Sequence, residues 1–290
     1  MKITIDESAG FCPGVKRVIK IAEQNLKDGK KIVALGSIIH NEKEIDRLKK
    51  MGLGVISQEV WEADSDFRKS LNGDVVLIRS HGVQPGILNF FEQRRVPFIN
   101  ATCSRVIKVQ QIVQEYADQD YQIVIVGKPN HPEVKGLLGY AGKQGVVVFN
   151  PEDLGQVNFN KKTVLIAQTT IDEHRFQSFA KNLKKGVEVF EVKNTICPVI
   201  KSRHQHMENF AKSNELIIMI AGQNSSNSLV LFNICKTQNS CSYFISDVNE
   251  LKPEWFENVK SVGITGGAST PDWQLIQLRN KIIRECRNKK

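Results

Sequence analysis

Three cysteines occupy the same place in three stretches of the chain that resemble one another. They are Cys12 in AGFCPGVKR, Cys103 in NATCSRVIKV and Cys197 in NTICPVIKSRH, at nearly equal intervals. Each directly precedes a segment of helical periodicity that carries lysine or arginine, and both the helix dipole and the nearby charges favour the thiolate, the form that binds metal. Any one of these cysteines alone is explained as a small buried residue, but three at one repeat position predict a shared metal centre.

Three thiolates suit two kinds of metal centre. Zinc would add a histidine or a water, whereas an iron–sulfur cluster would bind the three cysteines and leave one iron without a cysteine ligand. Zinc ribbons usually have close CxxC pairs, and this sequence has none, so the cluster is favoured. Cys235, Cys241 and Cys286 fall outside the repeat and are interpreted as ordinary thiols.

Polar loops follow the apolar runs that end at Gly36, Gly127 and Gly222, and further polar segments follow a second apolar run in each repeat. The candidate ligands that they supply are His40, His81, His131, Ser225, Ser226, Asn227 and Ser269. Imidazoles, hydroxyls, amides and glycine-exposed N–H groups at strand ends form an anion cradle, and diphosphate fits this chemistry better than a single carboxylate. For any one loop, a helix cap or an Asx turn is the alternative explanation.

One acid lies directly beside these histidines. Glu133, in HPEVKG, could relay protons near a redox-active metal. Thr169, in AQTT, occupies the later loop of the second repeat, where its hydroxyl could carry a proton or hold a substrate hydroxyl.

The elements that position these residues are short strands rich in Val and Ile that alternate with helical segments such as IDRLKKMG, VIKVQQIVQEYADQ and RFQSFAKNLKK. This alternation predicts an α/β fold of parallel sheets covered on both faces, with the ligands beyond the carboxyl ends of the strands. We expect three small α/β units related by a pseudo-threefold axis, with the three cysteines meeting at its centre. The expected boundaries are 14–103, 104–194 and 195–290, with 1–13 packing on the third unit.

The composition excludes several classes of protein. Six cysteines in 290 residues are too few for a disulfide scaffold, which fits a reducing compartment. No apolar stretch is long enough for a membrane span and no secretory signal is present, so we expect a cytoplasmic protein. The net charge of +9 is scattered among acids, which indicates an anionic substrate or an acidic protein partner rather than nucleic acid.

Taken together, these motifs resemble the LytB/IspH family of 4-hydroxy-3-methylbut-2-enyl diphosphate reductases over essentially the whole chain. The matching segments are GFCPGVKR, IIHNEKE, SHGV, TCSRVIKV, NHPEVKG, QTT, TICPVIKSR, NSSNS and GGASTP, in the family's order. The sequence departs from many members at TCSRV, where they have a proline after the cysteine. No candidate metal ligand is affected by this change.

The resemblance implies a trefoil of three α/β units around a [4Fe–4S] cluster held by Cys12, Cys103 and Cys197, with one iron not ligated by cysteine. It implies Glu133 as the proton donor, Thr169 beside the substrate hydroxyl, and diphosphate binding by His40, His81, Ser225, Ser226, Asn227 and Ser269, with His131 beside them. The implied partners are a small allylic diphosphate substrate and an external electron donor such as ferredoxin or flavodoxin. The reaction is the two-electron reductive loss of the substrate hydroxyl, giving isopentenyl and dimethylallyl diphosphate in the last step of the methylerythritol phosphate route.

Two other readings of the sequence stay open. A dehydratase of the quinolinate synthase type also resembles three repeats around a three-cysteine cluster, but it would consume no electrons. An iron–sulfur electron carrier or redox sensor would not need an anion pocket lined with histidine and serine.

Overall fold

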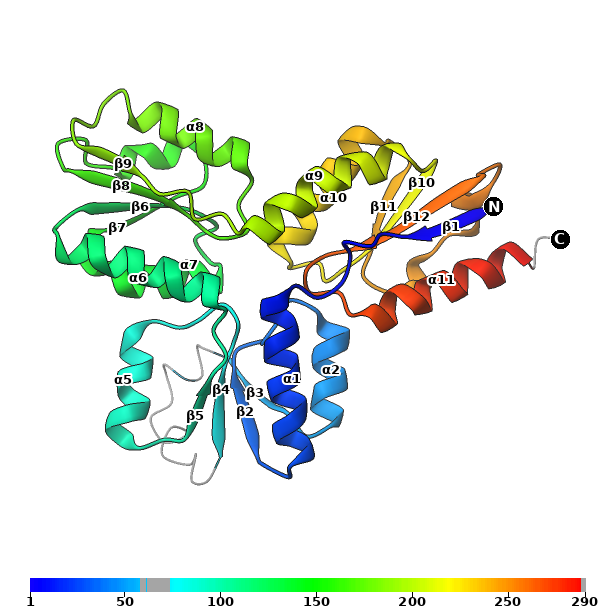
Figure 1. The fold of residues 1–290 in the computed structure, drawn as a ribbon, viewed down its shortest axis with the longest axis horizontal. Coiled ribbons are helices and arrows are strands. Elements are labelled where there is room, and N and C mark those ends of the chain that lie inside the picture. The colour runs from blue at the N-terminus through cyan, green and yellow to red at the C-terminus, as the bar shows by residue number, and fades with distance from the viewer. Residues whose placement is uncertain (58–60, 62–73, 288–290) are drawn as a thin grey trace. The chain divides into compact units, whose positions relative to one another are not determined.

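The computed structural model describes residues 1–57, 61 and 74–287, in which strands and helices alternate along the chain (Figure 1). Its strands form three four-stranded sheets. Every strand pair in these sheets is parallel. The expected class, three small α/β units with parallel sheets, is therefore confirmed.

The first sheet along the chain has the strand order β3-β2-β4-β5. Its strands are β2 (Ile32–Leu35), β3 (Gly54–Ile56), β4 (Val75–Ile78) and β5 (Phe98–Asn100). Among the described residues of this part of the chain, the helices are α1 (Pro13–Lys27), α2 (Glu42–Lys50) and α5 (Pro85–Arg94). One face of the sheet buries Leu35, Val76 and Ile78 against Ile87 and Phe91 of α5.

The second sheet has the equivalent order β7-β6-β8-β9. Its strands are β6 (Gln122–Val126), β7 (Gly145–Val148), β8 (Thr163–Ala167) and β9 (Phe190–Val192). The accompanying helices are α6 (Ser104–Asp118), α7 (Pro132–Ala141), α8 (Glu173–Leu183), and the short 3-10 turns η1 (Gly142–Gln144) and η2 (Pro151–Gln156).

Both faces of this second sheet are covered by helices, as the unbroken apolar runs predict. Ile123 and Ile125 pack with α6 and α7, whereas Val124 and Val126 pack on the other side with α8. Successive side chains of a strand point to opposite faces, so a strand buried on both sides is apolar throughout. The apolar residues of this sheet are thus buried, and polar residues such as His131 and Thr169 lie in the loops at its carboxyl edge.

The third sheet has the order β1-β12-β10-β11 and contains the first strand of the chain. Its strands are β1 (Lys2–Ile5), β10 (Leu216–Ile220), β11 (Ser242–Ile245) and β12 (Ser261–Gly266). The accompanying helices are α9 (Pro198–Lys212), α10 (Ser226–Gln238), α11 (Asp272–Arg287), and the turns η3 (Val248–Glu250) and η4 (Pro253–Phe256). One face packs on α11 and the other on α9 and α10.

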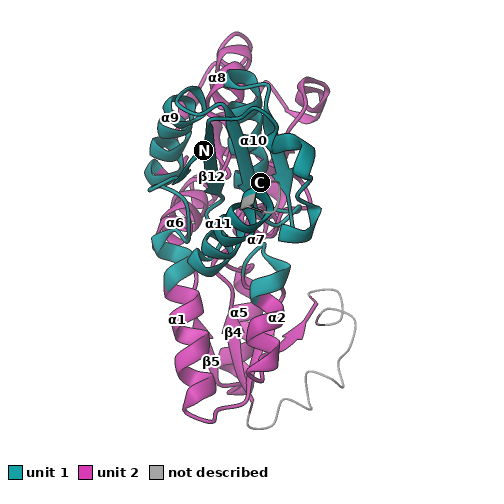
Figure 2. Ribbon diagram, turned by 90° about the vertical axis from the view of Figure 1, so that its right-hand side faces the viewer, with its two compact units in different colours: residues 1–16, 39–44, 198–290 teal, residues 17–38, 45–197 magenta. Residues whose placement is uncertain are grey.

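The chain forms two compact units, which Figure 2 distinguishes by colour. Unit 1 contains residues 1–16, 39–44 and 198–290, and unit 2 contains residues 17–38 and 45–197. Unit 1 therefore includes the third sheet and also a six-residue loop from the first repeat. The division at 14–103, 104–194 and 195–290 stays a prediction beside this two-unit division.

The helices expected from periodicity are confirmed as α2, α6 and α8. Within the described ranges, no helix combines the length and the apolar character needed to cross a bilayer.

Candidate functional site

The three repeat cysteines lie at the starts of three helices. Cys12 and Cys197 directly precede the first residues of α1 and α9, and Cys103 is the N-cap residue of α6. All three are of intermediate burial. The expectation that each cysteine precedes a helix is confirmed.

A second contact places each repeat cysteine in the same way. The backbone N–H of Cys103 donates to the carbonyl of Ser80, 3.0 Å away, in the loop after β4. The other two donate to equivalent loops: Cys12 to the carbonyl of Ala268 after β12, at 3.1 Å, and Cys197 to that of Thr169 after β8, at 2.9 Å. The repeat found in the sequence is therefore also a repeat in the structure. In each copy, the cysteine lies beside the loop that follows a central strand.

The chemistry of these cysteines fits an iron–sulfur centre. A partly exposed sulfur at a helix N-terminus is accessible to a metal, and the positive end of the helix dipole favours a negatively charged metal ligand there. The first turns of α1, α6 and α9 contain no acid that would oppose this. Cys235 differs, because burial in the core raises the pKa of its thiol to about 12 and keeps it protonated.

In unit 2, Glu133 and Thr169 are joined by two hydrogen bonds. Glu133 lies in the first turn of α7 and is only 2% exposed. The Thr169 N–H donates to its Oε1 at 2.6 Å and the Thr169 hydroxyl to its Oε2 at 2.7 Å. Burial raises the pKa of Glu133 to about 7, although the two hydrogen bonds from Thr169 lower it. Glu133 is thus a carboxyl group that can hold or release a proton near neutral pH.

His131 is the N-cap of α7, and its imidazole replaces the usual hydroxyl or carboxamide cap. The Nδ1 atom accepts the backbone N–H of Glu133 at 3.2 Å. A nitrogen that accepts a hydrogen bond carries no proton, so the neutral ring has its proton on Nε2. His81 lies against this ring, edge to face, with centroids 5.3 Å apart. Unit 2 therefore brings together His81, His131, Glu133 and Thr169.

In unit 1, the start of α10 gathers buried polar side chains. Ser225 caps the helix, because its Oγ accepts the Ser228 N–H at 3.3 Å and the Ser228 hydroxyl at 2.8 Å. Its own hydroxyl hydrogen is then directed elsewhere. Ser226 is also buried. Asn227 is 4% exposed, and its Oδ1 and Nδ2 atoms have no hydrogen-bond partner among the residues that the structure describes. A buried amide without partners costs stability, and a bound polar ligand would satisfy it.

His40 and Ser269 also meet in unit 1. The Ser269 hydroxyl donates to the backbone carbonyl of His40 at 3.0 Å. Gly222 lies in the loop after β10, two residues beyond its end. It is so close to the His40 carbonyl that a Cβ atom on residue 222 would clash with it. Of the predicted site residues in this unit, His40 and Ser269 are thus in direct contact, and Ser225, Ser226 and Asn227 share one helical turn.

Sequence reasoning missed two residues beside His40. Asn41 and Gln274 are 3% exposed, and their side chains are hydrogen-bonded to each other at 2.8 Å. A signal for Asn41 was present in the sequence, since Asn followed three residues later by Glu marks a helix start. Nothing in the local pattern around Gln274 indicates this contact, because its partner is 233 residues away.

Comparisons with known proteins agree over almost the whole chain. The family model described as "LytB protein" matches residues 3–283. The 4-hydroxy-3-methylbut-2-enyl diphosphate reductase of Aquifex aeolicus is 39% identical over 98% of this chain and 96% of its own. That of Helicobacter pylori strain Shi470 is 38% identical over 97% of this chain and 99% of its own.

Two solved structures share the fold. A structure of (E)-4-hydroxy-3-methyl-but-2-enyl diphosphate reductase, described as the terminal enzyme of the non-mevalonate pathway, matches with a TM-score of 0.71 and 38% identity, covering 98% of this chain and 100% of that one. The Plasmodium falciparum reductase matches with a TM-score of 0.85 and 26% identity, covering 97% and 87%. Three helices begin directly after a cysteine, and the family model and the relatives match almost the whole chain. This chain therefore belongs to the LytB family.

Proposed function

We propose that this protein reduces 4-hydroxy-3-methylbut-2-enyl diphosphate to isopentenyl and dimethylallyl diphosphate, the terminal reaction of the non-mevalonate route. The relatives at 38–39% identity carry this activity in their names. The observation in the molecule that best supports the reaction is the buried Glu133–Thr169 pair, a proton source built for neutral pH. The reaction consumes two electrons and two protons, and it releases water.

Cys12, Cys103 and Cys197 would hold the iron–sulfur centre, a [4Fe–4S] cluster with one iron lacking a cysteine ligand. Their helix-start positions and their shared backbone contacts support this assignment. Such a centre supplies electrons one at a time and a Lewis-acidic iron. The electrons would come from an external carrier such as ferredoxin or flavodoxin, and the protein would work in the cytoplasm.

Glu133 would supply the proton that turns the leaving hydroxyl into water. In its protonated form, Glu133 must donate, and the nearest oxygen is the Thr169 hydroxyl at 2.7 Å. Thr169 would then accept that proton and present its own hydrogen to the substrate hydroxyl. The Thr169 N–H bond to the other carboxyl oxygen persists in both protonation states and keeps the pair aligned. A second proton, added to either end of the allyl unit, would give the two products.

The diphosphate would be bound by neutral donors. Asn227 offers an unpartnered buried amide, Ser225 a hydroxyl hydrogen not used in its cap, and the first N–H groups of α10 lie beside them. Helix N-termini favour anions because their first backbone N–H groups have no partner within the helix and can donate to a ligand. The other diphosphate ligands that we propose are His40, His81, His131, Ser226 and Ser269.

The decisive experiment is anaerobic purification, iron and sulfide analysis, and turnover with the allylic diphosphate and a chemical reductant. We expect formation of both diphosphate products with stoichiometric electron consumption. Loss of water from the substrate without consumption of reductant, and without formation of these two products, would indicate a dehydratase instead. A bound cluster with no diphosphate affinity would indicate an electron carrier.

A further inference from the structure

Residues 39–44 follow β2 of the first sheet but pack within unit 1, beside the start of α11 (Figure 2). This segment carries His40, a candidate diphosphate ligand, so the contacts that seat it decide where His40 lies. We refer to residues 39–44 as the His40 loop.

The backbone of the His40 loop passes very close to β10. A Cβ atom on Gly222 would collide with the His40 carbonyl and lie 3.3 Å from the Asn41 Cα. The Ser269 hydroxyl donates to the same carbonyl. Only glycine leaves room for this approach, so the absence of a side chain at residue 222 allows the His40 loop to pack against it.

A buried hydrogen bond ties the loop to α11. The Asn41 Nδ2 group donates to Gln274 Oε1 at 2.8 Å, and the Asn41 Oδ1 atom accepts the Glu44 N–H at 3.0 Å. One side chain thus caps α2 and connects it to α11. Both residues are buried, so loss of either would leave the partner amide unpaired, which costs more than an exposed hydrogen bond.

The neighbouring residue of α11 makes a second tie. Trp273 Nε1 donates to Glu44 Oε2 at 2.8 Å. Glu44 is 1% exposed, so this hydrogen bond compensates a buried carboxyl group in the first turn of α2. Two consecutive residues of α11 therefore hold two residues of the His40 loop.

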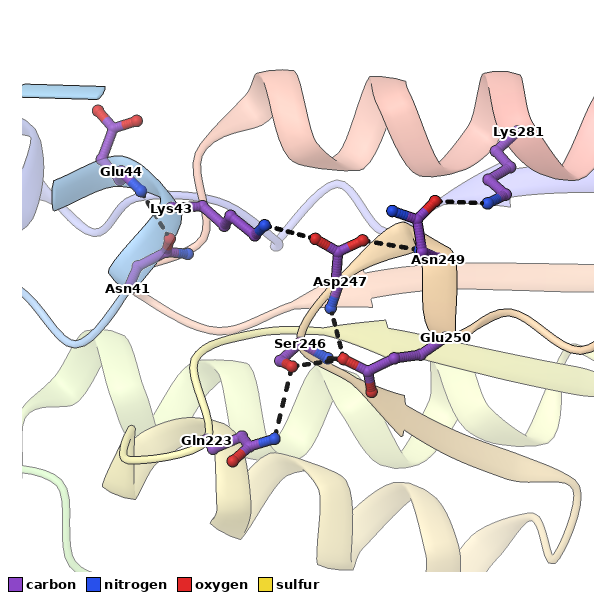
Figure 3. A network of polar contacts seen from close by, with 9 residues as sticks. All are labelled: Asn41, Lys43, Glu44, Gln223, Ser246, Asp247, Asn249, Glu250 and Lys281. Atoms are coloured by element: carbon purple, nitrogen blue, oxygen red, sulfur yellow. Dashed lines mark hydrogen bonds and ion pairs between the residues drawn. The ribbon is translucent and has the colours of Figure 1, made fainter. Parts of the chain in front are cut away.

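A third contact is at the surface. Figure 3 shows Lys43 reaching Asp247, whose carboxylate also accepts the N–H of Asn249. The Lys43–Asp247 ion pair measures 2.6 Å, but the Lys43 side chain is 52% exposed. Exposed ion pairs contribute little because solvent screens them. The buried Asn41–Gln274 bond and the partly buried Trp273–Glu44 bond, and not this ion pair, are expected to seat the loop.

We propose that Asn41, Glu44, Trp273 and Gln274 form a clamp that positions His40 for diphosphate binding, an inference that rests on the proposed function. None of the four needs to touch the substrate. They act through the His40 backbone, which they hold in contact with Gly222 and Ser269. Loss of these contacts therefore weakens diphosphate binding. Proton delivery by Glu133 stays unchanged.

The test compares Asn41→Ser, Gln274→Met and Trp273→Phe with the parent holoenzyme. Serine retains the helix cap, methionine retains the volume, and phenylalanine retains the ring, so each variant removes one tie with little other change. We expect KM for the allylic diphosphate and Kd for inorganic diphosphate to rise about tenfold, the effect of roughly one hydrogen bond, with kcat within about threefold of the parent. Iron content should not change.

Three controls make the test specific. Gln274→Glu retains an acceptor for Asn41 and should restore most of the affinity lost in Gln274→Met. The Asn41→Ser/Gln274→Met double variant should be no weaker than either single one, since both remove the same bond. Lys43→Ala, in the same loop, should bind like the parent.

Unchanged KM and diphosphate Kd in all three tie variants would overturn the clamp, as would variants that lose melting temperature and kcat together while KM stays constant. Inorganic diphosphate binding separates this outcome from failure of the proposed function. A parent that binds diphosphate but reduces no substrate would refute the reaction and still test the clamp. A parent that binds no diphosphate would refute both.

Discussion

Both carboxyl oxygens of Glu133 accept hydrogen bonds from one residue, Thr169, through its N–H at 2.6 Å and its hydroxyl at 2.7 Å. The first bond orients the carboxyl group, and the second connects it to a hydroxyl that can pass a proton on. The carboxyl group is buried, which favours its protonated form. Orientation and proton storage are thus supplied by a single pair of residues.

Glu133→Gln tests proton delivery directly. Glutamine retains the size, can accept the Thr169 N–H through its amide oxygen and can donate to the Thr169 hydroxyl through its amide nitrogen. It cannot supply a proton, however, and general acids contribute roughly 10²–10⁴ in rate. We expect turnover to fall at least about a hundredfold, with iron content and substrate affinity close to those of the parent. The matched control is Glu191→Gln. Glu191 is a glutamate in β9 of the same sheet, and its replacement should leave parental turnover unchanged. A Glu133→Gln variant that keeps a tenth of the parental rate or more would move the proton source elsewhere.

The pH dependence of turnover should follow the same group. Because the pKa of Glu133 is raised to about 7, the acid form is lost as the pH increases through this value. We expect kcat, measured with reduced methyl viologen, to fall about tenfold per pH unit above pH 7. A rate that stays constant up to pH 8.5 would contradict the assignment.

Stability provides an independent check on that pKa. Between the ordinary value of 4.5 and about 7, the folded protein retains a proton that the unfolded chain releases, so the free energy of unfolding falls as pH rises through this window. The loss amounts to about 3 kcal/mol and should be absent in Glu133→Gln. Denaturant unfolding of both proteins at pH 4.5, 6 and 8 measures it, and parallel curves would refute the shifted pKa.

Thr169 should need its hydroxyl and not merely its shape. Thr169→Val retains the volume and the N–H bond to Glu133, yet it breaks the second link of the relay. We expect turnover to fall by roughly 10² or more, whereas Thr169→Ser should recover most of it. Equal activity of the Val and Ser variants would show that the hydroxyl takes no part.

The cysteines should separate into two classes. Replacing Cys12, Cys103 or Cys197 with Ser should sharply lower the iron and sulfide content of the anaerobically purified protein. The same change at Cys235, Cys241 or Cys286 should leave both unchanged, because these thiols are outside the repeat and Cys235 is held protonated in the core. Similar iron loss across all six variants would refute the assignment.

Asn227→Leu should affect stability and binding in opposite directions. The Asn227 amide is buried without partners, so replacing it with an apolar side chain of similar size should raise the free energy of unfolding of the ligand-free protein by about 1–3 kcal/mol. The same change should weaken diphosphate binding by at least about tenfold, since a hydrogen bond to a charged group is lost. Calorimetry on the ligand-free protein and diphosphate titration measure the two effects. A variant that loses stability as well as affinity would mean that Asn227 is structural.

The units of the fold and the candidate chemistry follow from local patterns in the amino-acid sequence. Apolar runs of Val and Ile predict buried parallel strands because neighbouring side chains must face opposite helical layers, as Val124 and Ile125 do. The start of α6 at Cys103 is equally local, since the helical periodicity begins with the next residue. Repetition of this pattern identified three cysteines among six, and the order of the motifs indicated the family.

Which side chains meet depends on the folded arrangement of the chain. The Glu133–Thr169 pair joins loops of two neighbouring strands, and its burial, which raises the pKa of Glu133, depends on everything packed around it. The Asn41–Gln274 bond spans 233 residues, and the absence of room beside Gly222 is a property of two backbones. Local periodicity carries no information about such contacts, because hydrogen bonds and close approach depend on positions in space that the whole fold must first establish.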